Sequence, residues 1–514
     1  MSAPQMELPA YCAWLFACHF IPLYMLKNLL STGCTTLILL ISRPGVAQMT
    51  FNSTHGSFTG LGEVSWNPAA IADSRFGFEL RLLAVDMHAT NSAYRYAGPW
   101  SLRDLNEPFT VSSNDLILHN SSRPKLVSIG LNVRGPGVML RLSPRHSLAF
   151  SIGARAALQG NEVSQELVSS TREKFETPGS YTNNTANFNI NALSEWNATY
   201  SRVVLDQQTH VLKAGITVKR LMGIGSAYLQ SKQFDYTTTP ANRNTQLADT
   251  LVRLDRLDGA FGYSNPDAFR DLNAGTVRRW LMPGSSPGSG WGLDVGVVYE
   301  YRPDAEQYRY RDKKGALQTD YGRTKYRYRL SVALTDIGSI RYREQARAYN
   351  VKRTNLGINS QDINDITLDN YDEQLERILQ IQQPSYDNSF RAALPTALNV
   401  DLDYHLLWRL YANASVSQNM RGRYAVGMQR ISYAALTPRL ETRWLEVAVP
   451  LSLTNNYQDF AYGLLLRVGP LTVGSNNLPA LFRSTQPYGA NIFAELTFAL
   501  ANKRNKLTTT SAGN

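Results

Sequence analysis

Residues 400–410 read VDLDYHLLWRL, an alternation of apolar and polar side chains that predicts a β-strand. Successive side chains of a strand point to opposite sides, so Leu402 and Leu406 should share one face. The opposite face should carry Asp401, Asp403, His405 and Arg409. A strand of about 9–11 residues is long enough to cross a membrane at a tilt.

The same alternation recurs along most of the chain, in residues 127–134, 138–142, 148–156, 293–302, 326–335, 460–468 and 492–500. Gly135-Pro136-Gly137 and the stretch from Ser143 to His146 are typical turns. The first three stretches are therefore predicted to form a meander of three strands. The polar faces of these stretches include Arg141, Arg155, Arg327 and Arg329.

A soluble β-sandwich also alternates, with its polar face in water. Its strands are typically about 5–6 residues long, whereas several stretches here have the length of a membrane strand. Tyrosine and tryptophan lie near their ends, as interfacial girdles require. We therefore predict an all-β fold: a transmembrane antiparallel outer-membrane β-barrel of about 14 strands, spanning residues 76–502. The expected lumen-facing residues are Arg141, Arg155, Arg327, Arg329, Asp401, Asp403 and Arg409.

The N-terminal segment has the pattern of a secretory signal. Lys27 precedes the apolar run from Leu37 to Ile41, and Gly45-Val46-Ala47 offers a small-residue cleavage site. We expect residues 1–47 to be the signal peptide, with residues 1–24 an upstream start-site extension. All three cysteines lie in this segment, so a processed chain would contain no disulfide and no thiol site. Residues 503–514 are expected to be a polar tail.

The net charge of +11 does not indicate a nucleic-acid partner, because the basic residues fall singly in strands rather than in a patch. Gly284–Gly288 has the spelling of a nucleophile elbow but lies in a Gly/Pro/Ser stretch instead of a strand-turn-helix. The histidines show no zinc-ligand spacing. We therefore expect no catalytic residues, no metal and no cofactor, and a protein that is not an enzyme.

Three interruptions break the alternation. Residues 162–187 and 231–290 are rich in polar residues and predict extracellular loops or lumen plugs. A short helical insertion is predicted between residues 344 and 384. Asp369 could cap this helix, and its apolar stripe would be Tyr371, Leu375, Ile378 and Leu379. In a barrel, such a helix would be a periplasmic decoration or a lumen plug.

The element Asn67-Pro68-Ala69-Ala70 predicts a short capped turn, because Asn67 is a good N-cap and Pro68 suits the first helical position. It resembles the Asn-Pro-Ala element of FadL-like outer-membrane transporters and of PorV-like barrels of type IX secretion. The resemblance implies that residues 48–75 form a hatch in the lumen, where Glu63 and Asp73 could pair with wall arginines. The alternative is a capped turn that only covers one barrel end.

The chain from about residue 56 to 500 also resembles an uncharacterised Bacteroidota family of such barrels. The resemblance is carried by residues 60–75, 212–219, 334–342, 394–396 and 467–475. This family supplies no activity that can be carried over. The FadL-like resemblance implies an outer-membrane protein that transports small hydrophobic molecules, with outer-membrane lipid and a small hydrophobic ligand as partners. The alternative is a structural or secretion-associated scaffold that docks other envelope proteins.

Overall fold

The computed structural model describes residues 56, 60–98, 113–239, 251–269, 274–282, 284–304, 306, 309–311, 317–319, 326–367, 370–381, 386–482 and 487–501. The expected signal peptide, the expected polar tail and most of residues 48–59 lie outside these ranges. Within them, no helix has both the length and the hydropathy that a membrane-spanning helix needs.

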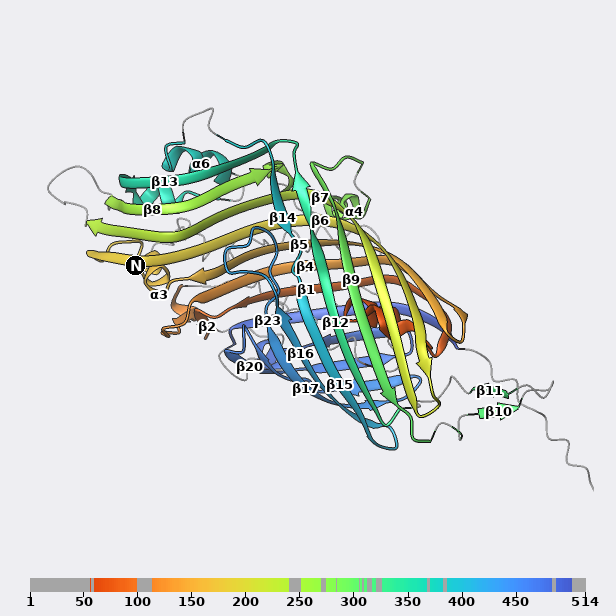
Figure 1. The fold of residues 1–514 in the computed structure, drawn as a ribbon. Helices are drawn as coiled ribbons and strands as arrows, with labels where there is room; N and C mark the ends of the chain where they lie inside the picture. The colour runs from red at the N-terminus through yellow and green to blue at the C-terminus, as the bar shows by residue number, and fades with distance from the viewer. Residues whose placement is uncertain are drawn as a thin grey trace, which may run out of the picture.

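The described strands form a closed antiparallel β-barrel of 14 strands, which confirms the predicted fold class (Figure 1). The continuous wall strands are β1 (Phe76–Asn91), β4 (Lys125–Ser143), β5 (His146–Val163), β6 (Gly179–Asp206), β7 (His210–Thr239), β9 (Gly288–Tyr301), β12 (Tyr328–Tyr342), β16 (Leu410–Asn419), β17 (Tyr433–Glu441), β22 (Leu471–Ser475) and β23 (Gly489–Ala501). Pairing of β1 with both β4 and β23 closes the sheet.

Three wall positions are each filled by two short strands in series. They are β14 (Phe390–Ala393) with β15 (Ala397–Leu407), β18 (Leu445–Ala448) with β19 (Leu451–Thr454), and β20 (Asp459–Tyr462) with β21 (Leu464–Val468). Pro450 separates the second pair and Gly463 the third. The amide of Gly463 donates to the Pro450 carbonyl across this gap, at 2.8 Å, so the break lies between hydrogen-bonded neighbours.

The outer surface of the wall is apolar. In β15, Leu402, Tyr404 and Leu406 are exposed, while Asp401 and Asp403 are buried. The same outward apolar face continues around the wall through Leu140, Leu148, Phe150, Ile216, Val218, Val295, Val297, Leu330, Leu436, Leu464 and Leu466. A soluble protein rarely exposes a contiguous apolar patch of more than a few hundred Å². This belt therefore faces lipid, and the protein is an outer-membrane barrel.

The predicted three-strand meander is wrong at its first turn. Residues 125–143 form the single strand β4, which passes through Gly135-Pro136-Gly137 in a β-bulge between Arg134 and Gly137. Because a bulge leaves an extra residue unpaired, a proline there removes no ladder hydrogen bond. The turn between Ser143 and His146 is present as predicted.

Strands β6 and β7 are 28 and 30 residues long and rise beyond the barrel (Figure 1). The first half of β7 pairs with β9, while its second half pairs with β8 (Leu251–Ser264), which in turn pairs with β13 (Ala346–Asn359). We call β8, β13 and the upper halves of β5, β6 and β7 the extension sheet. The interpretation of residues 162–187 and 231–290 as loops is therefore wrong where they form strands, at 162–163, 179–187, 231–239, 251–264 and 288–290. Strands outside the lipid need no apolar face, so their sequence resembles that of loops.

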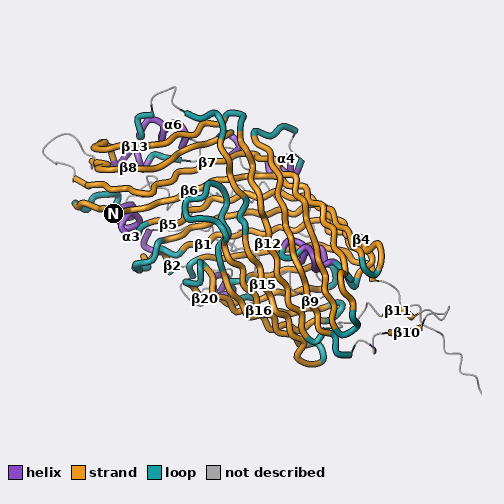
Figure 2. The backbone as a smooth tube through the Cα atoms, in the orientation of Figure 1, coloured by secondary structure: helices purple, strands orange, loops and turns teal. Residues whose placement is uncertain are grey.

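Short helices cover one face of the extension sheet (Figure 2). They are α3 (Gln165–Arg172), α5 (Ser360–Asn364) and α6 (Tyr371–Ile378). Tyr371, Ile378 and Leu379 pack with Tyr263 and Tyr349 of the sheet. The predicted helical insertion is thus present as α6, with Asn370 at its N-cap position. Both expected positions for it are wrong, because it packs on the extension sheet and neither plugs the lumen nor lies at the short-turn end. Asp369 lies outside the described residues.

Except for the connection between β9 and β12, which contains β10 (Arg309–Arg311) and β11 (Leu317–Thr319), short turns join the wall strands at the barrel end opposite the extension sheet. This is the periplasmic end in outer-membrane barrels. The remaining elements are η2 (Gly60–Ser65), η3 (Pro68–Ile71), β2 (Tyr94–Tyr96), η5 (Ser113–Asp115), β3 (Leu116–Leu118), η6 (Pro266–Phe269), α4 (Ala274–Leu281) and α7 (Leu478–Phe482). The last described residue of the hatch region, Arg75, leads directly into β1 from the short-turn end.

Replacing outward-facing Val295 with arginine should lower the free energy of unfolding by about 2–4 kcal/mol, because Val295 lies midway between Trp291 and Tyr301 on β9 and a charge there is at mid-bilayer depth. The matched control is Leu407→Arg, because Leu407 ends β15 at the short-turn rim, where the cost falls to about 0–1 kcal/mol. Denaturant titration in lipid vesicles measures both. Equal losses would contradict the assigned lipid-facing register.

Candidate functional site: a plugged, charged lumen

Residues 60–75 lie inside the barrel near its short-turn end, where Figure 1 shows them in red among the wall strands. Trp66 is only 3% exposed. Its indole Nε1 donates to Asp401 Oδ1 at 2.6 Å, and Asn399 Nδ2 donates to the Trp66 carbonyl at 3.1 Å. Ile71 packs with Met139 and Ala149 of the wall. We refer to residues 60–75 as the hatch.

Asn67 connects the hatch turn to the wall. Its Oδ1 accepts from the Ala69 amide at 2.8 Å, which makes it the N-cap of η3 with Pro68 in the first turn. Its Nδ2 donates to Ser331 Oγ at 2.8 Å and to the Val297 carbonyl at 2.9 Å. One fully buried amide therefore both shapes the turn and fixes it to β9 and β12.

Ion pairs also hold the hatch. Glu63 lies 2.6 Å from Arg329, one of the residues expected in the lumen. Asp73 lies 2.7 Å from Arg302, and Arg302 also pairs with Glu300, which binds Lys213 at 2.5 Å. These side chains are largely buried, and a buried charge needs a partner. Arg141 Nη1 donates to the Ser74 carbonyl at 2.7 Å.

Two wall glycines make room for the hatch. A Cβ on Gly296 would lie 2.1 Å from Asn67 Oδ1, and one on Gly215 would lie 2.4 Å from the Ala69 nitrogen. No side chain fits at either position while the hatch is in place. Sequence reasoning had no signal for this complementarity, because a glycine in a strand does not indicate what approaches it.

Charged side chains also fill the lumen beyond the hatch. Arg155 pairs with Asp336 at 2.8 Å and with Glu195. Lys219 lies 2.6 Å from Asp336 and 2.9 Å from Asp294. Nearer the short turns, Asp403 accepts two bonds from Arg439, at 2.7 and 2.9 Å, and one from the Tyr326 hydroxyl at 2.6 Å.

Arg155, Arg329, Asp401 and Asp403 thus lie in the lumen, but Arg327 and Arg409 do not. Arg327 precedes β12 and is exposed, with its guanidinium 5.1 Å from the centre of the outward Tyr404 ring. Its neighbour Tyr326 turns inward instead. Arg409 lies exposed in the turn before β16, over the Trp408 ring. Both errors come from extending the alternation past the end of a regular strand, where side-chain direction is no longer periodic.

A second plug occupies the barrel on its extension-sheet side. It consists of residues 420–432, between β16 and β17. Gln159 exchanges two hydrogen bonds of 2.8 Å with the main chain of Gln429. Asn187 Nδ2 donates to the Arg423 carbonyl and Gln230 Nε2 to the Tyr424 carbonyl, both at 2.8 Å. The side-chain amides of Gln159, Asn187 and Gln230 thus bond to the main chain of this loop, as a neighbouring strand would. The alternation of the sequence cannot indicate this role.

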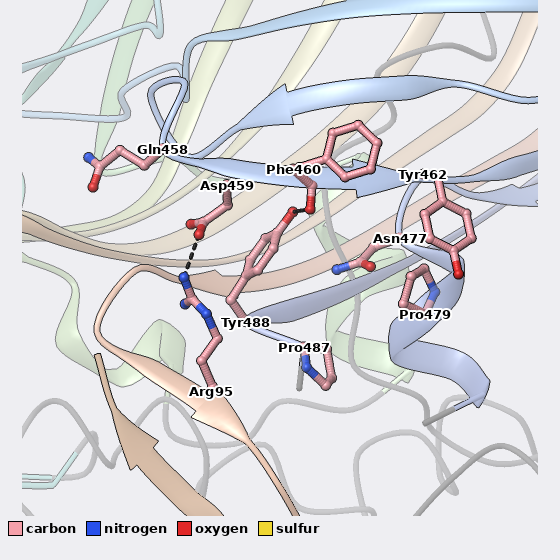
Figure 3. A pocket seen from close by; sticks show the side chains of 9 residues that line it. All are labelled: Arg95, Gln458, Asp459, Phe460, Tyr462, Asn477, Pro479, Pro487 and Tyr488. Carbon is pink, nitrogen blue, oxygen red and sulfur yellow. Dashed lines mark hydrogen bonds and ion pairs between the residues drawn. The ribbon is translucent and has the colours of Figure 1, made fainter. Parts of the chain in front are cut away.

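Two of the cavities between described residues open at the surface. One, of about 290 Å³, lies among Arg95, Asp459, Phe460, Tyr462, Pro487 and Tyr488 (Figure 3). Arg95 pairs with Asp459 at 2.5 Å, and the Tyr488 hydroxyl donates to the Phe460 carbonyl at 3.2 Å. These polar groups of the cavity lining are therefore already bonded to one another.

The other cavity, of about 340 Å³, is the hatch cavity. Gly62 and Glu79 line its inner side, and Trp444, Phe498 and Leu500 line its outer side. Glu79 Oε2 accepts from the Leu61 amide at 2.6 Å, so the hatch forms one wall of this cavity.

The closed sheet, the lipid-facing belt and the plugged lumen define an outer-membrane β-barrel. The chain belongs to the family of unknown function DUF5723, whose model matches residues 68–476. No curated protein matches the sequence.

Among solved structures, the chain is similar to a deltaS2S3 mutant of the monoaromatic hydrocarbon channel TodX, with 12% identity over 87% of this chain and 95% of that chain and a TM-score of 0.39. It is also similar to a Pseudomonas aeruginosa FadL homologue, with 11% identity over 89% of this chain and 98% of that chain and a TM-score of 0.30. The translocator domain of the autotransporter NalP from Neisseria meningitidis is 9% identical over 82% of this chain and 88% of that chain, with a TM-score of 0.29. All three likenesses are distant.

Gly296→Ala should lower the free energy of unfolding by about 1–3 kcal/mol, because the added methyl group overpacks the contact with Asn67. Gly284→Ala is the control, since a Cβ there meets nothing within 4 Å and the change should stay within about 0.5 kcal/mol. Denaturant titration of the folded barrel measures both. A Gly296 variant as stable as the control would mean that the hatch does not occupy this site in solution.

Proposed function

We propose that this protein is a gated outer-membrane channel for small hydrophobic molecules, closed by the hatch. The hatch cavity carries the proposal. It reaches from Gly62 of the hatch to Phe498 and Leu500, which belong to the apolar outer surface. Phe76 and Trp444 add to this apolar part of the lining, and the charged residues that also line the cavity are Glu79, Arg443, Arg467 and Glu495. The cavity is large enough for a small ligand.

The pairing of β23 supports an exit at this place. Leu471–Gly474 of β22 pair with residues 493–496 of β23. Farther along, from Thr497 to Ala501, β23 has ladder partners only in β1. The Thr497 amide donates to the Pro470 carbonyl at 2.9 Å, so beyond Thr497 β23 has a strand neighbour on one side only, next to the hatch cavity. A hydrophobic molecule that occupies the hatch cavity could leave there to the lipid-facing surface.

A second candidate is a scaffold that docks other envelope proteins. The extension sheet favours it, because β8, β13 and their covering helices rise beyond the barrel and add nothing to its closure (Figure 1). Passage through the centre would also have to break the buried Arg155–Asp336 and Lys219–Asp336 pairs. A scaffold protein could function with both of these ion pairs intact, because nothing has to pass through its lumen.

Deleting residues 60–73 should make the cells take up more of a small hydrophobic antibiotic, because the hatch cavity would then join the lumen. Asn67→Ala should give a smaller increase, because it removes a cap worth about 0.5–2 kcal/mol and the bonds of the Asn67 amide to Val297 and Ser331, but leaves the ion pairs of Glu63 and Asp73 in place. Growth inhibition of cells expressing each variant measures this.

Heat-dependent gel mobility is the control for folding, because a closed barrel resists detergent until boiled. If the deletion variant folds and sensitivity stays at the wild-type level, the channel proposal fails and the scaffold becomes the better account.

A further inference from the structure

The outer face of the wall has an arginine cluster just beyond its upper aromatic girdle. On β9, outward-facing Trp291 and Tyr301 are the two ends of an 11-residue stretch, the length of a tilted membrane strand. Trp291 pairs in register with Arg220 of β7, and Arg220 pairs with Trp196 of β6. This row marks where the lipid-facing belt ends on the extension-sheet side.

One row farther along, Arg341 of β12 lies directly opposite Arg391 of β14. Both are exposed. Arg341 also lies opposite Ser289 of β9, which is two residues past Trp291 and on the same outer face. Side chains directly opposite in an antiparallel pair have Cβ atoms about 4.5–5.5 Å apart, and like charges there destabilise the sheet.

Nothing in the described part of the chain neutralises this pair. None of the ion pairs between described residues includes Arg341, Arg391 or Arg220. Arg341 donates to Ser389 Oγ at 3.3 Å. Arg220 donates to the Gly290 carbonyl and lies over the Trp291 ring, with its Cζ 5.2 Å from the ring centre. Charged carboxylates do occur nearby in sequence, at Glu344 and Asp387, but they form no ion pair with these arginines.

The cluster extends along the rim. Arg343, which follows β12, is exposed. Helix α4 packs against the outer side of β6, where Ser194 Oγ donates to the Leu281 carbonyl, and its last turn carries exposed Arg278 and Arg279. Neighbouring strands are about 4.8 Å apart, so these positive charges lie close to one another along the rim, across β6, β7, β9, β12 and β14.

We propose that Arg341 and Arg391, with Arg220 beside them, bind the phosphate of an outer-leaflet lipid headgroup. Guanidinium groups form paired hydrogen bonds with phosphate oxygens, and one phosphate between Arg341 and Arg391 would remove their repulsion. The cluster is continuous with the lipid-facing belt, so a lipid bound there keeps its acyl chains against Trp291 and the apolar wall. A free anion would gain the bonds to the guanidinium groups but not the acyl-chain contacts with Trp291 and the wall.

The test uses the purified protein in phosphatidylcholine vesicles, with and without added diphosphorylated lipid A. The measurement is the temperature at which the heat-resistant gel band is lost. In the wild type, diphosphorylated lipid A should raise this temperature and dephosphorylated lipid A should not. The R341Q/R391Q double variant should lose the rise. In phosphatidylcholine alone it should be at least as stable as the wild type, because its like-charge pair is gone.

Arg327→Gln is the matched control, because Arg327 is an exposed arginine on the outer face at the opposite rim, and this variant should keep the rise. Three outcomes would overturn the proposal: a rise that persists in the double variant, a double variant less stable than the wild type in phosphatidylcholine, or an equal rise from inorganic phosphate alone. A persistent rise would mean that lipid A does not bind at these arginines. A less stable double variant would mean that the arginines stabilise the fold. An equal rise from inorganic phosphate would mean that the ligand is a free anion and not a lipid.

Discussion

Main-chain hydrogen bonding in lipid is the constraint on which the whole structure depends. A strand edge that faces hydrocarbon leaves N–H and C=O groups without water, so a sheet can span the membrane only if it closes. Strand β1 meets this need by pairing with β4 on one side and with β23 on the other. Closure then forces one side of every wall strand outward into lipid and the other inward. The two-residue alternation of the sequence follows from it.

The hatch is held by the charged and polar side chains that the closed barrel places in its lumen. Inward side chains such as Arg329, Arg302 and Asp401 lie in a narrow lumen, where a charge without a partner is costly. Glu63, Asp73 and Trp66 supply partners from the hatch. Removing one member of a buried pair typically costs about 3–5 kcal/mol. The hatch and the wall therefore stabilise each other, and opening the hatch requires that water or a ligand replace these contacts.

Sequence alone predicted the features that follow from periodicity and local capping. The outward position of Leu402, the lumen position of Asp403 and the cap at Asn67 are of this kind. The features it missed depend on contacts between distant segments. Arg327 left the lumen because the chain bends before β12, and Arg302 rather than a predicted arginine met Asp73. The loop held by Gln159 and the glycines facing Asn67 and Ala69 depend on segments more than a hundred residues away, so no local pattern could indicate them.

The central claim is that residues 60–75 are folded inside the barrel, and hydrogen–deuterium exchange of their amides tests it most directly. Backbone amides in this segment, such as those of Leu61, Asn67 and Ala69, donate to Glu79, to the Glu63 carbonyl and to Asn67 inside the barrel. In the folded protein they should therefore exchange as slowly as the strand amides of β12. Exchange as fast as in an unstructured peptide, in a barrel whose β12 stays protected, would contradict the account.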